Sequence, residues 1–159
     1  MPIIANRLKA MGITLPPPPD RAGLYTYCRF FGNNLVYLSG CGPALPQEAP
    51  VLGKVGAEVS LEEGKRAARN CVLNALSVLE KYIGDLDRVE CFAKMLAFVA
   101  SADTFTRQPE VADGASELLV ELFGETVGCP ARSAIGVNVL PGNIPAEVEL
   151  LLIVKEQPA

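Results

Sequence analysis

Hydrophobic residues follow a clear helical spacing in the middle of the chain. From Leu61 to Ile83 the apolar side chains return at steps of three and four residues, which is typical of a helix with one buried face. Ser60 and Glu63 have the spacing of a capping box at the start of this segment, and Gly84 follows its end. The pattern therefore predicts one long amphipathic helix over residues 61–83.

Other apolar runs are shorter and rich in valine, leucine, isoleucine and aromatic residues, which favours strands. Turn-forming residues at Gly32–Asn34 separate the first two runs and predict an antiparallel hairpin. Pro141–Asn143 separates the last two runs and predicts a second turn. A second long helix is expected between Asp103, as its cap, and Gly124, with Pro109 marking either its first turn or a break. The strands are predicted over residues 24–31, 35–39, 89–99, 131–140 and 146–154, with a short helix over 6–13.

This order, ββαβαββ, indicates an α+β fold with a mixed sheet and two long helices on one face. A chain of 159 residues is close to one average domain, so we expect a single domain over 1–159, with 1–22 as an N-terminal extension. Two helices cover only one face of such a sheet, and the chain has no third long amphipathic helix. A second copy of the chain is the simplest cover for the other face, which predicts an obligate homo-oligomer.

Composition narrows the chemistry that the chain can perform. It contains 14 Lys and Arg against 18 Asp and Glu, a formal charge of −4, so a surface for nucleic acid is not expected. Histidine is absent, which excludes Ser-His-Asp and Cys-His nucleophiles and histidine metal ligands. The five cysteines form no C-x-x-C pair, and no acidic metal cluster or phosphate-binding glycine motif occurs. No metal or cofactor is expected, and the lack of a signal peptide or membrane-length apolar run predicts a cytoplasmic protein without membrane contact.

Arg132 is the most informative single residue, because it starts an otherwise apolar strand. A guanidinium in such a place should meet a carboxylate, either from the protein, as a structural pair at a subunit contact, or from a ligand. Glu147 and Glu149 lie two residues apart and so share one face of the last strand. If the last two strands form a hairpin, Glu147 returns to the vicinity of Arg132. Glu147 could then act as a general base on water, or it could lie at a solvated strand edge.

Two further groups could contribute to a site near the first hairpin. Three aromatic residues, Tyr25, Tyr27 and Phe30, could line a pocket or belong to the core. Ser39 and Gly40 belong to a tight glycine-containing turn that could present backbone amides to an anion.

Several segments together resemble the RidA/YjgF family. They are residues 32–40, 53–56 and 67–74, and above all Pro130-Ala131-Arg132-Ser133-Ala134, which is followed 15 residues after the arginine by Glu147. The resemblance extends from about Gly23 to Val154. It implies a chorismate-mutase-like fold, a homotrimer and clefts between subunits, which agrees with the uncovered sheet face.

The resemblance also implies a function. Well-understood family members hydrolyse small reactive 2-imino acids and enamines to 2-oxo acids and ammonia. By position, Arg132 would bind the substrate carboxylate and Glu147 would orient or deprotonate water. Tyr25 would line the cleft, from a neighbouring subunit, and Ser39 and Gly40 would form its backbone wall. The alternative is a non-catalytic protein that binds a small carboxylate metabolite in the same cleft. Ribonuclease activity, for which some members are named, finds little support in an acidic chain without histidine.

Overall fold

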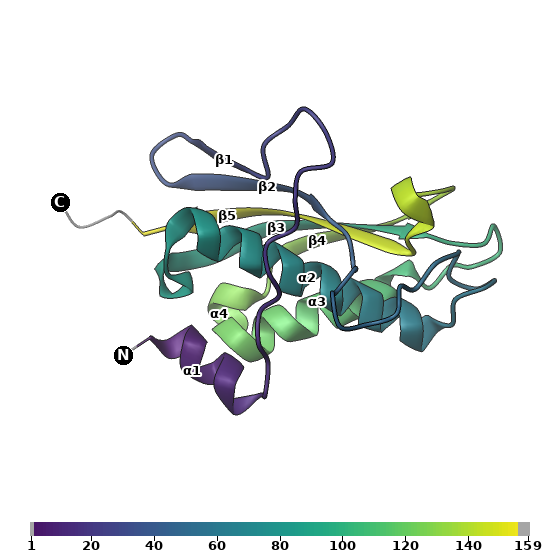
Figure 1. The fold of residues 1–159 in the computed structure, drawn as a ribbon, viewed down its shortest axis with the longest axis horizontal. Coiled ribbons are helices and arrows are strands. Elements are labelled where there is room, and N and C mark those ends of the chain that lie inside the picture. Colours follow the sequence, from purple (N-terminus) through teal and green to yellow (C-terminus); the bar gives the residue numbers. More distant parts are fainter. Residues whose placement is uncertain (1, 156–159) are drawn as a thin grey trace.

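The computed structural model describes residues 2–155 and shows a five-stranded mixed sheet with helices packed on it, as expected (Figure 1). The strand order is β1-β2-β5-β3-β4. The strands are β1 (Cys28–Phe31), β2 (Leu35–Cys41), β3 (Val89–Ala100), β4 (Ala131–Val137) and β5 (Ala146–Val154). The helices are α1 (Ile3–Ala10), α2 (Leu61–Ile83), α3 (Gln108–Phe123) and α4 (Glu125–Gly128), with 3-10 turns at Leu86–Arg88 and Pro141–Asn143.

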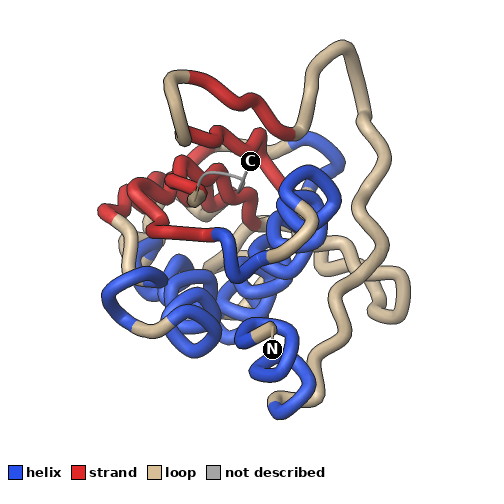
Figure 2. The backbone as a smooth tube through the Cα atoms, turned by 90° about the vertical axis from the view of Figure 1, so that its left-hand side faces the viewer, coloured by secondary structure: helices blue, strands red, loops and turns tan. Residues whose placement is uncertain are grey.

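The helices all lie on one side of the sheet, which forms a second layer (Figure 2). Helix α2 has the predicted bounds, and its capping box is present, because Ser60 Oγ accepts from the Glu63 amide while the Glu63 carboxylate accepts from the Ser60 amide. Met95 of β3 and Leu150 and Leu152 of β5 are almost fully buried against the helices. The core is therefore the interface between one sheet face and α2 and α3.

Strand β4 does not pair with β5, so the predicted hairpin between the last two strands is wrong. β4 lies at the sheet edge, parallel to β3, and β3 separates it from β5. The chain leaves β3, passes through α3 and returns as β4, and a helical crossover of this kind produces parallel neighbours. The turn at Pro141–Asn143 is present, but β5, which follows it, pairs with the other edge of β3 and not with β4.

Some element ends also differ from prediction. Helix α3 starts at Gln108 after Arg107, so Asp103 does not cap it. Pro109 lies in the first turn and does not break the helix, which decides between the two possibilities for this proline. Helix α1 starts three residues earlier than predicted, because Asp87 Oδ1 and Oδ2 accept hydrogen bonds from the amides of Ile4 and Ile3. A carboxylate more than 80 residues away thus caps this helix, which local sequence cannot show.

The second face of the sheet carries exposed apolar side chains, as the shortage of helices predicts. Phe31 is 43% exposed, Tyr37 40% and Ile135 44%. Isolated apolar residues are common on protein surfaces, but a whole sheet face without cover indicates an interaction surface. Among the helices of residues 2–155, even the longest is not apolar enough to cross a membrane.

Candidate functional site

An irregularity in β2 brings Gly40 against Glu147. Leu38 pairs with Leu150 and Cys41 with Val148, so β2 contains one residue more than β5 over this stretch. Such a bulge redirects nearby side chains and is frequent next to functional sites. A Cβ atom at residue 40 would lie 2.7 Å from Glu147 Cδ, and nearer still to its Oε1. Glycine is therefore the residue that lets the Glu147 carboxylate lie directly over the bulge.

Glu147 occupies the open face of the sheet and is partly buried. Burial, and secondarily the charge of Glu149, raise the pKa of the Glu147 carboxyl above its ordinary value. Within residues 2–155, no hydrogen-bond donor contacts this carboxylate. Glu149, by contrast, accepts a 2.8 Å hydrogen bond from the Tyr37 hydroxyl. Glu147 is thus the carboxylate with free acceptor atoms and a pKa shifted towards the range of a general base.

Ser39 and Gly40 lie within β2, so the expected tight turn at these residues is wrong, and the Ser39 amide is not free to bind an anion. That amide donates to the Tyr27 carbonyl at 2.9 Å, and the Ser39 hydroxyl donates to the Thr26 carbonyl at 2.8 Å. Tyr27 is buried, whereas Tyr25 is 37% exposed and packs edge-on against it with ring centroids 5.3 Å apart. Of the two tyrosines, Tyr25 is the one that presents its ring to the surface.

Cysteine chemistry does not support a nucleophile beside Glu147. Cys41 is buried directly after the bulge, and burial, with a smaller contribution from the Glu147 charge, raises the pKa of its thiol to about 12. A thiol with such a pKa stays protonated near neutral pH and is a weak nucleophile. Among residues 2–155, no group of three potential ligand side chains is arranged to hold a metal ion.

Within one copy of the protein, the Arg132 and Glu147 side chains do not lie together. Arg132 pairs with Met95, whose side chain enters the helix-facing core, whereas Glu147 pairs with Phe98 on the open face. Alternate residues of a strand point to opposite faces, so the two side chains project from opposite sides of the sheet. The sequence-based expectation that one chain brings Glu147 back to Arg132 is wrong, because it depended on the hairpin.

The Arg132 guanidinium contacts helix α3. Its Nη1 donates to Asp113 Oδ1 at 2.8 Å and to Ser116 Oγ at 2.9 Å. Within residues 2–155, its Nε and Nη2 atoms have no hydrogen-bond partner. The Arg132 side chain is 23% exposed to solvent. The Nε and Nη2 edge is a pair of parallel donors suited to a carboxylate. The internal ion pair therefore fixes the guanidinium and leaves one edge available.

Sequence reasoning did not identify Asp113 and Ser116 as partners of Arg132. The available signal was their spacing of three residues, which places two polar side chains on the same face of a helix. That face packs on the edge strand that contains Arg132, and only the crossover from β3 to β4 reveals this contact.

Comparison with known proteins identifies the fold family. Residues 5–153 match the family model described as "YjgF/chorismate_mutase-like, putative endoribonuclease". The chain belongs to the YjgF family. The match covers nearly the whole chain and agrees with the two-layer architecture and the ββαβαββ order.

Individual relatives support the same assignment. Protein TCP17 of Trypanosoma cruzi is 39% identical over 149 residues, which cover 94% of this chain and 92% of that protein. The crystal structure of Atu1372 from Agrobacterium tumefaciens, a protein of unknown function, is 35% identical, with a TM-score of 0.87 over 97% of this chain and 94% of that one. A "putative endoribonuclease" from Shewanella oneidensis is 30% identical, with a TM-score of 0.90 over 95% and 99% of the two chains. These relatives share the fold and much of the sequence of this chain, but their names do not establish its reaction.

Proposed function

We propose that this YjgF family protein is a hydrolytic deaminase of small 2-imino acids and their enamine tautomers. The observation that carries the proposal is the Glu147 carboxylate, which lies over the Gly40 bulge with a raised pKa and free acceptor atoms. The substrate is an electrophile that already reacts with water. Binding the substrate beside a water molecule and one proton acceptor is therefore sufficient for catalysis, and neither histidine nor a metal is required.

In the proposed reaction, Glu147 accepts a proton from water as the oxygen attacks the imine carbon. The proton then passes to nitrogen, which gives a tetrahedral intermediate with one hydroxyl and one amino group. Glu147 next takes the hydroxyl proton and returns it to the amino group, the carbon–nitrogen bond breaks as the carbonyl forms, and a 2-oxo acid and ammonia leave. Arg132 binds the substrate carboxylate through its Nε and Nη2 edge. Ser39 and Gly40 form the wall beneath the reacting carbon, and Tyr25 borders the cleft.

Because Arg132 and Glu147 project from opposite faces, the proposal places them together between two copies of the chain. One copy supplies Arg132 from its edge strand, and the next supplies Glu147 from its open face. The exposed Phe31, Tyr37 and Ile135 give that face the apolar character of a subunit contact. The proposed assembly is a cyclic homotrimer. Its proposed cytoplasmic location is compatible with the five cysteines, which are all free thiols.

Ammonia release from freshly generated 2-iminobutyrate, corrected for spontaneous hydrolysis, tests the proposal. Arg132→Ala should lower the enzymatic rate roughly a hundredfold, through loss of two charge-assisted hydrogen bonds. Arg107→Ala is the matched control, because Arg107 also pairs with a carboxylate of α3, Glu110, but lies outside the site. It should keep the wild-type rate.

Equal rates for wild type and Arg132→Ala would overturn the proposed site. Saturable, Arg132-dependent binding of 2-oxobutyrate without ammonia release would identify a metabolite-binding protein instead of an enzyme. A third arm offers single-stranded RNA at low salt. Cleavage of that RNA without imine hydrolysis would contradict the deaminase and support the activity for which some relatives are named.

A further inference from the structure

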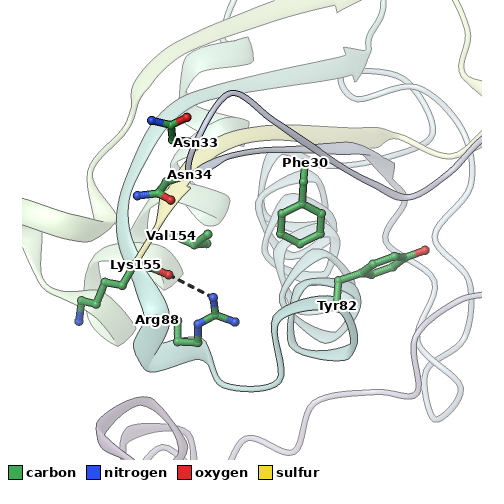
Figure 3. Close-up of a pocket in the computed structure, with 7 residues that line it drawn as sticks. All are labelled: Phe30, Asn33, Asn34, Tyr82, Arg88, Val154 and Lys155. Atoms are coloured by element: carbon green, nitrogen blue, oxygen red, sulfur yellow. Dashed lines mark hydrogen bonds between the residues drawn. The ribbon is translucent and has the colours of Figure 1, made fainter. Parts of the chain in front are cut away.

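A surface cavity lies at the opposite end of the sheet from Gly40 and Glu147 (Figure 3). Its volume is about 610 Å³, within the range that suits a small organic ligand. The end of β5, the turn between β1 and β2, the end of α2 and the 3-10 turn before β3 meet around it. Seven residues line it: Phe30, Asn33, Asn34, Tyr82, Arg88, Val154 and Lys155.

Arg88 places a positive charge in this cavity, and no carboxylate of residues 2–155 pairs with it. Its Nη1 donates to the Ile83 carbonyl at 2.8 Å and its Nη2 to the Lys155 carbonyl at 3.1 Å. Both acceptors are neutral. Each Nη atom retains a second N–H group. Figure 3 shows the guanidinium projecting into the space between the end of β5 and two aromatic rings.

The two rings form an apolar wall opposite the end of β5. Phe30 is 49% exposed and Tyr82 42% exposed, although both line a concave surface. Buried Val154 contributes a further apolar surface. Exposed aromatic rings that face a cavity gain stability when a planar apolar group covers them.

Two carboxamides complete the polar part of the lining. The side chains of Asn33 and Asn34 form no hydrogen bond within residues 2–155, and Figure 3 shows them at the turn above Val154. A carboxamide can donate to a carboxylate or accept from a ring N–H. The Lys155 ammonium, in contrast, is already bound to the Asp87 carbonyl at 2.9 Å and points away from the cavity.

We infer that this cavity binds a small aromatic carboxylate, with its ring against Phe30 and Tyr82 and its carboxylate on Arg88. The ligand class follows from what lines this one cavity: a guanidinium and two carboxamides that have no carboxylate or hydrogen-bond partner, respectively, among residues 2–155, and two exposed rings. The site is separate from Glu147 and Arg132, so it stands independently of the proposed deaminase activity.

Equilibrium dialysis of the full-length protein with 2-naphthoate tests the inference. Naphthalene-2-carboxamide keeps the ring and removes the charge, and acetate keeps the charge and removes the ring. We expect one 2-naphthoate per chain, with each of the two comparison ligands bound roughly tenfold more weakly or worse. Excess 2-oxobutyrate should not displace 2-naphthoate, because that ligand belongs to the other site.

Variants locate the binding. Arg88→Lys and Tyr82→Ser should each weaken 2-naphthoate binding by roughly tenfold. Tyr82→Ser tests the site even if Arg88→Lys destabilises the end of α2, because the Tyr82 hydroxyl has no protein partner among the described residues. Lys81→Gln is the matched control, since it removes a neighbouring charge that does not line the cavity, and it should bind like wild type.

Three results would overturn the inference. The first is that 2-naphthoate shows no saturable binding up to millimolar concentration. The second is that the carboxamide binds as tightly as the carboxylate. The third is that Tyr82→Ser and a folded Arg88→Lys protein both bind 2-naphthoate as tightly as wild type. An absence of saturable binding would also be expected if a second copy of the chain packed against Phe30 and Tyr82. In either case it would exclude a ligand site in this cavity.

Discussion

Gly40→Ala perturbs the proposed site with a single methyl group. The new Cβ would lie 2.7 Å from Glu147 Cδ, whereas ordinary carbon contacts lie near 3.5–4.0 Å. The Glu147 carboxylate must therefore move by about 1 Å, and a displacement of that size at a catalytic group costs about a hundredfold in rate. The backbone of residue 40 does not have a positive φ, so alanine itself adds no backbone strain there.

The same substitution should have little effect on stability. The Glu147 side chain can rotate away at a cost of about 1 kcal/mol, and alanine recovers about half of that by restricting the unfolded chain. We expect the melting temperature to change by about 2 °C or less. Thermal melts and ammonia release from 2-iminobutyrate, measured on the same preparation, separate the two effects.

Gly42→Ala provides the matched control. Its Cβ would lie 2.9 Å from Ile144 Cδ1, the terminal methyl of a flexible side chain, so the crowding is similar but no carboxylate is displaced. Gly42→Ala should retain the wild-type rate within about twofold. A folded Gly40→Ala protein with the wild-type rate would refute the claim that Glu147 must lie over residue 40 for catalysis.

Three further predictions concern charged groups. Glu147→Gln should abolish ammonia release yet raise the melting temperature at pH 7. The pKa of Glu147 is raised in the folded protein, so its negative charge opposes folding at neutral pH. The stabilising effect of the substitution should therefore fade as the pH falls through that raised pKa. A lower melting temperature for Glu147→Gln at pH 7 would contradict this prediction. Asp87→Ala removes both contacts that cap α1 and should cost about 1 kcal/mol in urea unfolding, whereas exposed Asp103→Ala should cost almost nothing, and equal losses would contradict the capping role. Asp113→Ala should raise KM more than it lowers kcat by releasing Arg132, and Asp113→Asn should restore most of the affinity; an unchanged KM would show that this contact does not position the guanidinium.

The fold was largely predictable because its strongest signals are local. The Ser60 capping box and Gly84 define α2, and the apolar spacing between them defines the face that packs on the sheet. The shortage of helices correctly indicated an open sheet face. The cap of α1 was not predictable, because Asp87 is brought to that helix by the fold and not by the local sequence.

The site was predictable only in part. The alternation of side chains along β5 correctly placed Glu147 and Glu149 on one face, but this alternation does not show which strand lies next to β5. Because β4 follows a helical crossover, it lies beyond β3, and its register turns Arg132 towards α3 instead of Glu147. The contact between Glu147 and Gly40 depends on a one-residue bulge, which has no reliable signature in the sequence.

The central claim is that Arg132 of one copy and Glu147 of the next form one site. Arg132→Ala and Glu147→Gln chains, each inactive alone, are co-expressed with different tags, and mixed oligomers are isolated by both tags. In a trimer assembled at random, about a quarter of the interfaces combine an intact arginine from one variant with an intact glutamate from the other.

Ammonia release from 2-iminobutyrate by these mixed oligomers is the most direct measurement. Recovery of about a quarter of the wild-type rate, or somewhat more after selection for mixed species, is the predicted result. If mixed oligomers form, as native mass spectrometry would show, but remain as inactive as the two parent variants, the intersubunit site is contradicted.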